Sequence, residues 1–259
     1  VVGKKVVVIG GGNAAVDAAR EALRLGAESV TILYRRTRDE MPAYKEEIEE
    51  AEREGVIFKT LVMPKEIVVK DGRAAGVACN HMWLADFDRS GRRRPEAYPD
   101  KTFVEEADQV IAAIGQKLPL EQLTDGVDLK QNAWRFVDAN PVTGQTSAPW
   151  IFAGGDAVEG PSSVVDAVGA GERAAVGIDQ YLTGEEHAFW RTPCPLDTEF
   201  DPDAEPVEAP RAHAKLIAVE KRKGNFNELE LPFTEKVALR EAARCLRCDY
   251  REEEAVAVK

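Results

Sequence analysis

Two glycines and an alanine near the start of the chain have the types and the spacing of a dinucleotide-binding turn. Gly10, Gly12 and Ala15 follow directly on four apolar residues, Val6 to Ile9, and form the pattern G-x-G-x-x-A. The first glycine permits a sharp strand-to-helix turn, the second removes the side chain where a pyrophosphate approaches the backbone, and the alanine lets helix and strand pack closely. The N–H groups and the dipole of the following helix then face the phosphates.

The residues about 20 positions further on decide which nucleotide fits such a turn. A site for NAD needs Asp or Glu there to hold the ribose 2′-hydroxyl, whereas this chain has Tyr34, Arg35 and Arg36. Two guanidinium groups suit a 2′-phosphate, which they grip through charge-assisted hydrogen bonds. The sequence therefore favours NADPH over NADH. The alternative is that both arginines are ordinary solvated residues at a strand end.

Two of the four cysteines, Cys245 and Cys248, form a C-x-x-C pair near the end of the chain. A [4Fe–4S] cluster takes four cysteine ligands, so this pair would have to share a cluster or a metal with another segment or chain. The alternatives are a redox pair or an inert, packed helix end. Cys79 and Cys194 have no partner spacing and are interpreted as packing residues. The three histidines are scattered singly, and no side chain is identified as a catalytic acid, base or nucleophile.

The glycine turn needs a strand before it and a helix after it. A strand buried on both faces is predicted over 6–9, a helix from Asn13 to Gly26, and a second strand over 29–34, which together begin a βαβ unit. The remaining patterns predict, in chain order, a charged helix over 44–55, a strand over 56–62, a hairpin of 66–70 and 74–78 across Asp71-Gly72, a strand over 83–87, a buried strand over 108–115, a short strand over 135–138, a buried strand over 150–154, a helix over 162–182, an extended linker over 192–212 and a helix over 234–246.

The predicted helix over 162–182 is rich in small residues, with interior glycines at 169 and 171. Glycine inside a helix costs about 1 kcal/mol relative to alanine. Two of them indicate that something approaches the helix backbone closely, and both a ligand and a neighbouring helix would explain this.

Composition indicates a globular protein with a sizeable core, because 44% of the 259 residues are hydrophobic. The formal net charge of −12 argues against nucleic acid and anionic membranes as main partners. No apolar run is long enough to span a membrane and no signal peptide is visible, and the cysteine usage does not suggest a secreted disulfide framework, so a cytoplasmic location is expected. The chain begins at Val1 without a methionine, as a fragment would.

Five segments together resemble the NAD(P)H-dependent FAD oxidoreductases typified by the glutamate synthase small subunit, a family similar to the pyridine nucleotide-disulfide oxidoreductases. Adrenodoxin reductase and the flavin region of dihydropyrimidine dehydrogenase are relatives. The segments cover most of residues 5–184 and are VVVIGGGNAAVDAAR, TILYRRTRDEMPA, DFDRSGRRR, ADQVIAAIGQ and TSAPWIFAGGDAVEGPSSVV.

The resemblance implies an α/β, Rossmann-like flavoprotein fold in which an NADPH domain is inserted into an FAD domain. It places Arg35 and Arg36 at the 2′-phosphate, Asp156 at the ribityl chain of FAD, and the N-terminus of the helix after Ser162 at the flavin ring. The residues that it assigns to NADPH pyrophosphate are Gly10, Gly12, Asn13, Ala14 and Ala15. The residues that it assigns to FAD are Gly115, Gly155, Asp156, Ser162, Ser163 and Val164.

The chain departs from this family in lacking the first FAD-binding glycine motif and the preceding iron–sulfur segment. We therefore expect residues 1–113 to form the NAD(P)H-binding domain, residues 114–184 the C-terminal part of the FAD domain, and residues 185–259 a linker and a helix that carries the cysteine pair. The segment EAARCLRCDY resembles the opening of the family's iron–sulfur segment.

The expected function is transfer of hydride from NADPH to FAD, with electrons passing on to iron–sulfur clusters of another segment or chain. In such enzymes the protein positions the cofactor and tunes its electrostatics. This reading implies an iron–sulfur or large catalytic partner subunit in a hetero-oligomer. The alternative is a non-catalytic dinucleotide-binding or assembly subunit without a complete flavin site. A flavin disulfide reductase is a weak third reading, because the only cysteine pair lies far away in the tail.

Overall fold

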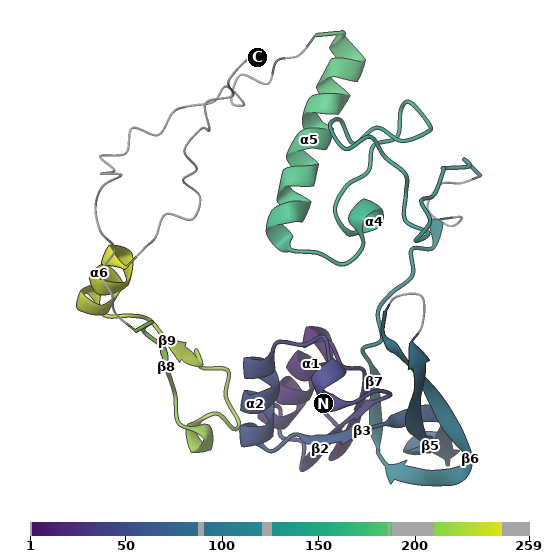
Figure 1. The fold of residues 1–259 in the computed structure, drawn as a ribbon, viewed down its shortest axis with the longest axis vertical. Helices are drawn as coiled ribbons and strands as arrows, with labels where there is room; N and C mark the ends of the chain where they lie inside the picture. The colour runs from purple at the N-terminus through teal and green to yellow at the C-terminus, as the bar shows by residue number, and fades with distance from the viewer. Residues whose placement is uncertain (1, 88–90, 121–125, 186, 188–209, 245–259) are drawn as a thin grey trace. The chain divides into compact units, whose positions relative to one another are not determined.

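The computed structural model describes residues 2–87, 91–120, 126–185, 187 and 210–244 (Figure 1). The chain divides into two compact units. The first consists of Val1–Gly115 and the described part of Pro202–Lys259, and the second is Gln116–Asp201. The described residues contain no helix that is both long and apolar enough to cross a membrane.

The first unit is built on a parallel sheet with the strand order β3-β2-β1-β7. The strands are β1 (Lys5–Ile9), β2 (Ser29–Tyr34), β3 (Ile57–Thr60) and β7 (Gln109–Ala112). The apolar run predicted as a strand buried on both faces is confirmed, because the three valines at the centre of β1 are at most 1% exposed. The C-terminal ends of β1 and β2 lie at the same edge of the sheet, which is where ligands bind in such folds.

Helices α1 (Asn13–Arg24) and α2 (Lys45–Glu54) belong to the same unit. The predicted helix ends are confirmed, since Gly26 and Gly55 adopt the positive φ angles of 103° and 102° that favour glycine. The inner face of α1 packs on the sheet with small and branched side chains, which are Ala15, Val16, Ala19, Ala22 and Leu23.

A three-stranded antiparallel sheet interrupts the α/β pattern, as predicted. Its strands are β4 (Val62–Lys70), β5 (Arg73–Phe87) and β6 (Arg93–Glu106). The hairpin across Asp71-Gly72 is confirmed, with both residues at positive φ. The single strand predicted over 56–62 is wrong: Leu61, at φ 53°, divides it between β3 and β4. The strands predicted over 74–78 and 83–87 are both parts of β5.

The second unit contains α4 (Asp156–Glu159) and α5 (Val164–Thr183). The predicted long helix is confirmed to within two residues at each end. The strands predicted over 135–138 and 150–154 are wrong, since the structure has only isolated bridges there, Gln131 with Val137 and Gln145 with Phe152. Two features explain this: Arg135 has a φ of 66°, and no described strand lies alongside to complete a ladder.

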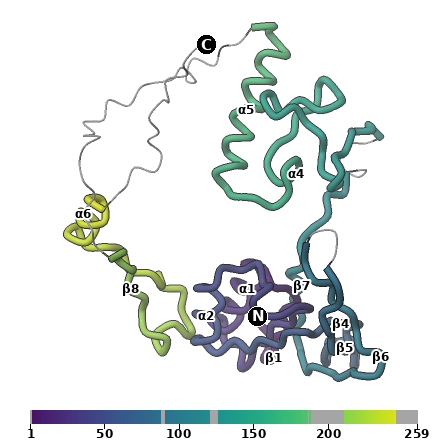
Figure 2. The backbone as a smooth tube through the Cα atoms, viewed as in Figure 1, coloured from purple at the N-terminus to yellow at the C-terminus, as the bar shows by residue number. Residues whose placement is uncertain are grey.

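The tail, which is the described segment 210–244, has little regular structure before its helix. Its elements are β8 (Lys215–Leu216), the short helical turn Val219–Lys221, β9 (Glu230–Leu231) and α6 (Glu235–Ala243). Figure 2 shows the path of this segment, which approaches α2 between β8 and β9. The linker predicted over 192–212 lies outside the described residues up to 209, and so do the last two residues of the helix predicted over 234–246.

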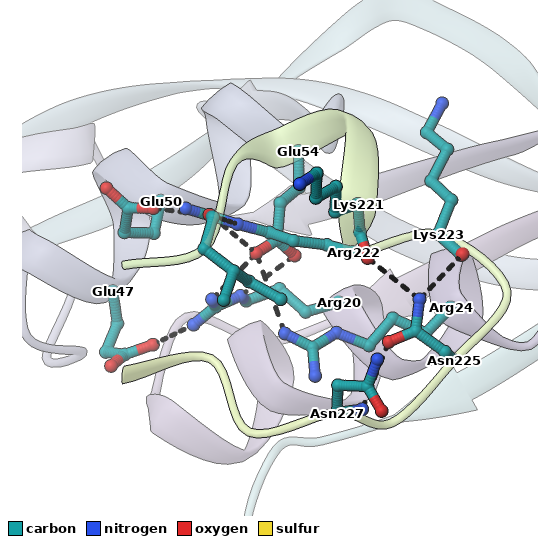
Figure 3. A network of polar contacts seen from close by, with 11 residues as sticks. Arg20, Arg24, Glu47, Glu50, Glu54, Lys221, Arg222, Lys223, Asn225 and Asn227 are labelled. Carbon is teal, nitrogen blue, oxygen red and sulfur yellow. Dashed lines mark hydrogen bonds and ion pairs between the residues drawn. The ribbon is translucent and has the colours of Figure 1, made fainter. Parts of the chain in front are cut away.

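A buried cluster of ion pairs fastens the tail to α1 and α2 (Figure 3). Arg20 on α1 donates two hydrogen bonds to Glu54 on α2, from Nε at 3.1 Å and from Nη2 at 2.8 Å. Arg222 of the tail donates through Nη1 to Glu50 at 2.6 Å and to Glu54 at 2.9 Å. All four residues are at most 8% exposed. The tail is therefore an integral part of the first unit.

Acid is expected to weaken the fold through Glu54. Burial alone would raise its pKa, but hydrogen bonds from Arg20 and Arg222 hold the pKa of Glu54 below the ordinary 4.5. A carboxyl group whose pKa is lower in the folded state stabilises the fold above its unfolded pKa, and this contribution is lost as the pH falls through the folded pKa. Urea unfolding should show the free energy of unfolding falling below about pH 4.5, with a shallower fall in Glu54→Gln. Identical pH dependences would contradict this account.

Candidate functional site

The glycine turn between β1 and α1 contains two glycines that packing requires and one that it does not. A Cβ atom on Gly10 would lie 2.3 Å from the carbonyl oxygen of Ala113, and one on Gly11 would lie 2.4 Å from the ring of Tyr34. A Cβ atom on Gly12 would meet nothing within 4 Å. The space beside Gly12 is therefore open to a ligand at the point where the fingerprint predicts a pyrophosphate.

The first turn of α1 offers backbone N–H groups next to that space. Gly12 caps the helix without a side-chain hydrogen bond, and its carbonyl oxygen accepts from the N–H groups of Ala15 at 2.9 Å and Val16 at 3.2 Å. The N–H groups of Asn13 and Ala14 precede those bonds and have no partner within the helix. The Asn13 side chain accepts a hydrogen bond from the Tyr44 backbone N–H at 2.9 Å. This bond ties the start of α1 to the residue directly before α2. The arrangement suits an anion.

The structure separates the two arginines that follow β2. Arg35 is exposed, whereas Arg36 is 6% exposed. The Nε of Arg36 donates to the carbonyl oxygen of Arg93 at 3.0 Å, and the Arg36 carbonyl oxygen accepts from the N–H of Leu61 at 3.0 Å. Of the pair, only Arg35 lies at the surface.

A third arginine reaches the same strand end from the β5–β6 hairpin, and sequence reasoning did not identify it. The Nη2 of Arg92 donates to the hydroxyl oxygen of Tyr34 at 3.2 Å and to the carbonyl oxygen of Glu40 at 2.9 Å. The Tyr34 hydroxyl itself donates to that carbonyl at 2.8 Å. The only signal for Arg92 in the sequence is the arginine run at positions 92–94, which does not reveal a partner 58 residues earlier.

The carboxylate of Glu40 lies in the turn that these side chains hold. It accepts from the backbone N–H of Thr37 at 3.2 Å and from its hydroxyl at 2.8 Å, which closes a capping box on the short helical turn Arg38–Glu40. Burial raises the pKa of Glu40, but the Thr37 hydrogen bonds and the charges of Arg36 and Arg92 outweigh it and leave that pKa lowered. The Glu40 carboxylate therefore closes the turn through its two hydrogen bonds from Thr37.

A second candidate site is an open cavity of about 570 Å³ within the second unit. The size suits a cofactor, because small-molecule sites measure roughly 300–1,000 Å³. Five of the residues expected at FAD line it together, whereas the sixth, Gly115, belongs to the first unit, where it has a φ of 90°. The lining consists of Phe152, Ala153, Gly154, Gly155, Asp156, Ser162, Ser163, Val164, Ala167, Ala170, Gly171, Ala174 and Ile178.

The small residues of α5 have two different neighbours. A Cβ atom on Gly154 would lie 2.8 Å from the Cβ of Ala170, and one on Gly177 would lie 2.2 Å from the carbonyl oxygen of Thr143, so the loop before α4 packs tightly on the helix. A Cβ atom on Gly171 would meet nothing within 4 Å, and Gly171 lines the cavity. Packing within the chain therefore explains Gly177 and the cavity borders Gly171, whereas Gly169 has neither neighbour: its added Cβ would meet only the end of the Arg173 side chain, at 3.5 Å.

The N-terminus of α5 is closed by its own serines. The Ser163 hydroxyl oxygen accepts from the Asp166 N–H at 3.1 Å, and the hydroxyls of Ser162 and Ser163 each donate to the Asp166 carboxylate at 2.7 Å. The hydrogen bond from the Ser163 hydroxyl, followed in size by the one from Ser162, lowers the pKa of Asp166. The N–H of Ser162 donates to Oδ1 of Asp156 at 3.3 Å, which ties the first residue of α4 to the start of α5. Sequence reasoning had not connected Asp166 with the two serines.

The cysteine predictions divide between described and undescribed residues. Cys79 is 1% exposed, as expected of a packing residue, and burial raises the pKa of its thiol to about 11. Cys194, Cys245 and Cys248 lie outside the described residues. Across the part of the chain that the structure describes, no group of three or more His, Cys, Asp or Glu residues could hold a metal ion.

Comparison with protein families gives a match over residues 1–171 to the family described as pyridine nucleotide-disulphide oxidoreductase. Among curated proteins, the chain is 42% identical to the NADP(+)-dependent formate dehydrogenase subunit beta of Moorella thermoacetica over 96% of its own length and 36% of that protein. It is 40% identical to the NADPH-Fe(3+) oxidoreductase subunit beta of Geobacter sulfurreducens over 96% of this chain and 42% of the relative.

The glutamate synthase [NADPH] small chain of Escherichia coli is 39% identical over 70% of this chain and 39% of that protein. The expected resemblance to this group is thereby confirmed. The chain spans about two fifths of the length of these three relatives, which are themselves named as subunits or chains.

Solved structures share the fold at low sequence identity. The thioredoxin reductase of T. acidophilum matches with a TM-score of 0.53 at 22% identity, over 70% of this chain and 53% of that one. FprA from Mycobacterium tuberculosis in complex with NADPH matches with a TM-score of 0.53 at 19% identity over the same shares. The predicted α/β, Rossmann-like fold is confirmed.

Proposed function

Because this chain belongs to the pyridine nucleotide-disulphide oxidoreductase family, we propose that it is part of an NADPH-dependent flavin oxidoreductase, in which it holds the nucleotide and one side of the flavin. The observation that carries the proposal is the open space beside Gly12 at the N-terminus of α1. That space lies at the C-terminal end of β1, where the βαβ fold binds the pyrophosphate of a dinucleotide.

The nucleotide in this proposal is NADPH. Gly12 lets the pyrophosphate approach the backbone, and the N–H groups of Asn13 and Ala14 donate to it. Arg35, exposed directly after β2, meets the 2′-phosphate. The aromatic and basic residues at this strand end leave no carboxylate at the position that favours NADH.

The flavin in this proposal is FAD, bound in the cavity beside α5. Asp156 holds the ribityl chain through its carboxylate, and the N-terminal end of α5 at Ser163 and Val164 directs its dipole towards the ring. FAD supplies the hydride-accepting chemistry when bound. The exposed lining of α5 at Gly171 provides space without a side chain. In this reading the protein binds and orients, and none of its side chains transfers a proton.

The proposed partner is an iron–sulfur or large catalytic subunit, in a hetero-oligomer. Alignments with the two beta subunits include the tail, since they cover 96% of this chain, whereas the alignment with the glutamate synthase small chain covers 70%. We therefore propose a closer functional likeness to the two beta subunits than to the glutamate synthase small chain. Cys245 and Cys248 would share a [4Fe–4S] cluster with another segment or chain in this arrangement.

The first test is an absorbance spectrum of the natively expressed protein before and after NADPH is added without oxygen. Flavin bands that bleach on addition of NADPH are the expected result, because hydride transfer reduces the flavin. A colourless protein that still binds NADPH would overturn the enzyme proposal. It would favour the alternative, a dinucleotide-binding or assembly subunit without a complete flavin site.

The substitution Gly171→Leu is expected to abolish flavin binding without lowering the stability of the protein. The Gly171→Leu side chain would occupy the cavity, so bound flavin should be lost, while replacing an interior helix glycine should stabilise α5 by up to about 1 kcal/mol. Flavin absorbance per protein and the melting temperature measure the two effects. The matched control is Gly169→Leu on the same helix, outside the cavity lining. Equal flavin retention in both variants would rule out the cavity as the flavin site.

A further inference from the structure

We propose that the β5–β6 hairpin completes the 2′-phosphate site: Arg92 and Arg35 are its two surface cations, and the buried Arg36 fastens the hairpin in place. This inference rests on the proposed function, because it assumes that a phosphorylated nucleotide binds at the end of β2. It changes the assignment made from sequence, in which the adjacent pair Arg35 and Arg36 held the phosphate. The added cation, Arg92, comes from the hairpin of the antiparallel sheet, whereas Arg35 and Arg36 follow β2 of the parallel sheet.

Arginines of the hairpin and of the segment after β2 hold the hairpin against the end of β2. The Nε of Arg36 donates to the Arg93 carbonyl oxygen at 3.0 Å, across a sequence separation of 57 residues. Arg93 in turn donates to carbonyl oxygens of β5, to Ala85 from Nε at 3.2 Å and to Leu84 from Nη2 at 2.5 Å. The residue that follows Arg92 is thereby anchored at both its backbone and its side chain, which fixes the start of β6 next to Arg92.

The side chain of Tyr34 connects Arg92 with the glycine turn, because it contacts both. Its Nη2 donates to the Tyr34 hydroxyl at 3.2 Å, and the ring of Tyr34 lies 2.4 Å from where a Cβ atom on Gly11 would be. The Tyr34 side chain therefore touches Arg92 through its hydroxyl and the glycine turn through its ring carbons. Arg92 and Arg35 are both exposed, whereas Arg36 is buried, so a ligand in solvent can reach the first two.

The charges at this strand end favour a phosphate over a hydroxyl. Arg36 and Arg92 lie near the carboxylate of Glu40, which already accepts hydrogen bonds from Thr37 in the capping box. The neighbouring Arg38 is paired with Glu52 at 2.5 Å and Arg94 with Glu96 at 3.0 Å. The positive charge of Arg92 would attract a 2′-phosphate and so raise the affinity for NADP⁺. The 2′-hydroxyl of NAD⁺ is uncharged, so the same cation should add little to the affinity for NAD⁺. The predicted signature is a selective effect on the phosphorylated nucleotide.

The test compares Arg92→Met with Arg94→Met in the full chain, by titration calorimetry with NADP⁺ and NAD⁺. Both variants remove one exposed guanidinium from the same hairpin, but only the first lies against Tyr34. Arg92→Met should lose on the order of tenfold in NADP⁺ affinity, as expected for one charge-assisted contact, and less than about twofold in NAD⁺ affinity. Arg94→Met should change neither, and Arg92→Lys should recover part of the loss.

Two different failures remain distinguishable. If wild-type protein binds NADP⁺ tightly and Arg92→Met weakens NADP⁺ and NAD⁺ equally, or weakens neither, the hairpin has no part in phosphate recognition and the inference is overturned alone. If wild-type protein binds neither nucleotide, the proposed function fails and the inference with it. Circular dichroism melts of the variants show whether Arg92→Met has merely loosened the turn around Tyr34, which would weaken both nucleotides together.

Discussion

Valine in place of Gly12 should weaken NADP⁺ binding about a hundredfold and leave the protein folded. The backbone at Gly12 has φ −89° and ψ 176°, which β-branched residues adopt readily, and an added Cβ meets nothing within 4 Å. The side chain would instead fill the place of the pyrophosphate and break its bonds to the helix N-terminus. Loss of two charge-assisted bonds lowers affinity about a hundredfold. Titration with NADP⁺ and urea unfolding measure the two outcomes.

The control for this experiment is the adjacent glycine. Gly11→Ala places a Cβ atom 2.4 Å from the ring of Tyr34, so it should lower the free energy of unfolding by about 1–3 kcal/mol through overpacking. Gly12→Val should lower it by about 1 kcal/mol at most, the difference between a glycine and an apolar N-cap. Normal NADP⁺ affinity in Gly12→Val would remove the observation on which the proposed function rests.

The second large effect is expected at Arg222. Arg222→Met removes the cation that bridges Glu50 and Glu54, and both carboxylates stay buried. Removing one partner of a buried ion pair typically costs about 3–5 kcal/mol, because a charge is left uncompensated. Arg20 still pairs with Glu54, so we expect about 3 kcal/mol, the lower end of that range. Urea unfolding at neutral pH measures the loss.

Lys223→Met is the matched control, since Lys223 follows directly in the chain and is exposed. It should change stability by about 0.5 kcal/mol or less, as surface substitutions usually do. Protease should also cut the tail of Arg222→Met faster than the tail of the control, because the segment no longer has its buried anchor. Equal stabilities of the two variants would show that the buried cluster adds nothing to the fold.

Local patterns were sufficient where one element and its turn carry the information. The run from Val6 to Gly26 contains its own strand, glycine turn, helix and helix end, and all of these are confirmed. The same holds for α5, whose N-cap Ser163 and final Gly184 are both visible in the sequence. Each of these signals depends on neighbours within a few residues.

Predictions failed where the outcome depends on distant partners. The apolar segment at 150–154 resembles a buried strand, but a strand needs a neighbour, and only Phe152 forms a bridge. The burial of Arg36 depends on the carbonyl of Arg93, which no local pattern reveals. Arg222 is the extreme case, because its carboxylate partner Glu50 lies 172 residues earlier. Residue type and spacing identify a candidate site, but long-range contacts decide which of its charges face solvent.

The sequence separation of 172 residues between Glu50 and Arg222 delays the completion of the buried cluster during translation. A ribosome adding about 5–20 residues per second takes roughly 10 to 30 s to travel from Glu50 to Arg222. During this interval the nascent first unit has Arg20 but no tail, and the whole of the second unit is translated before the missing cation emerges. The last ion pairs of the first unit therefore form only after the second unit has been made, so the unit whose translation begins first is the last to be completed.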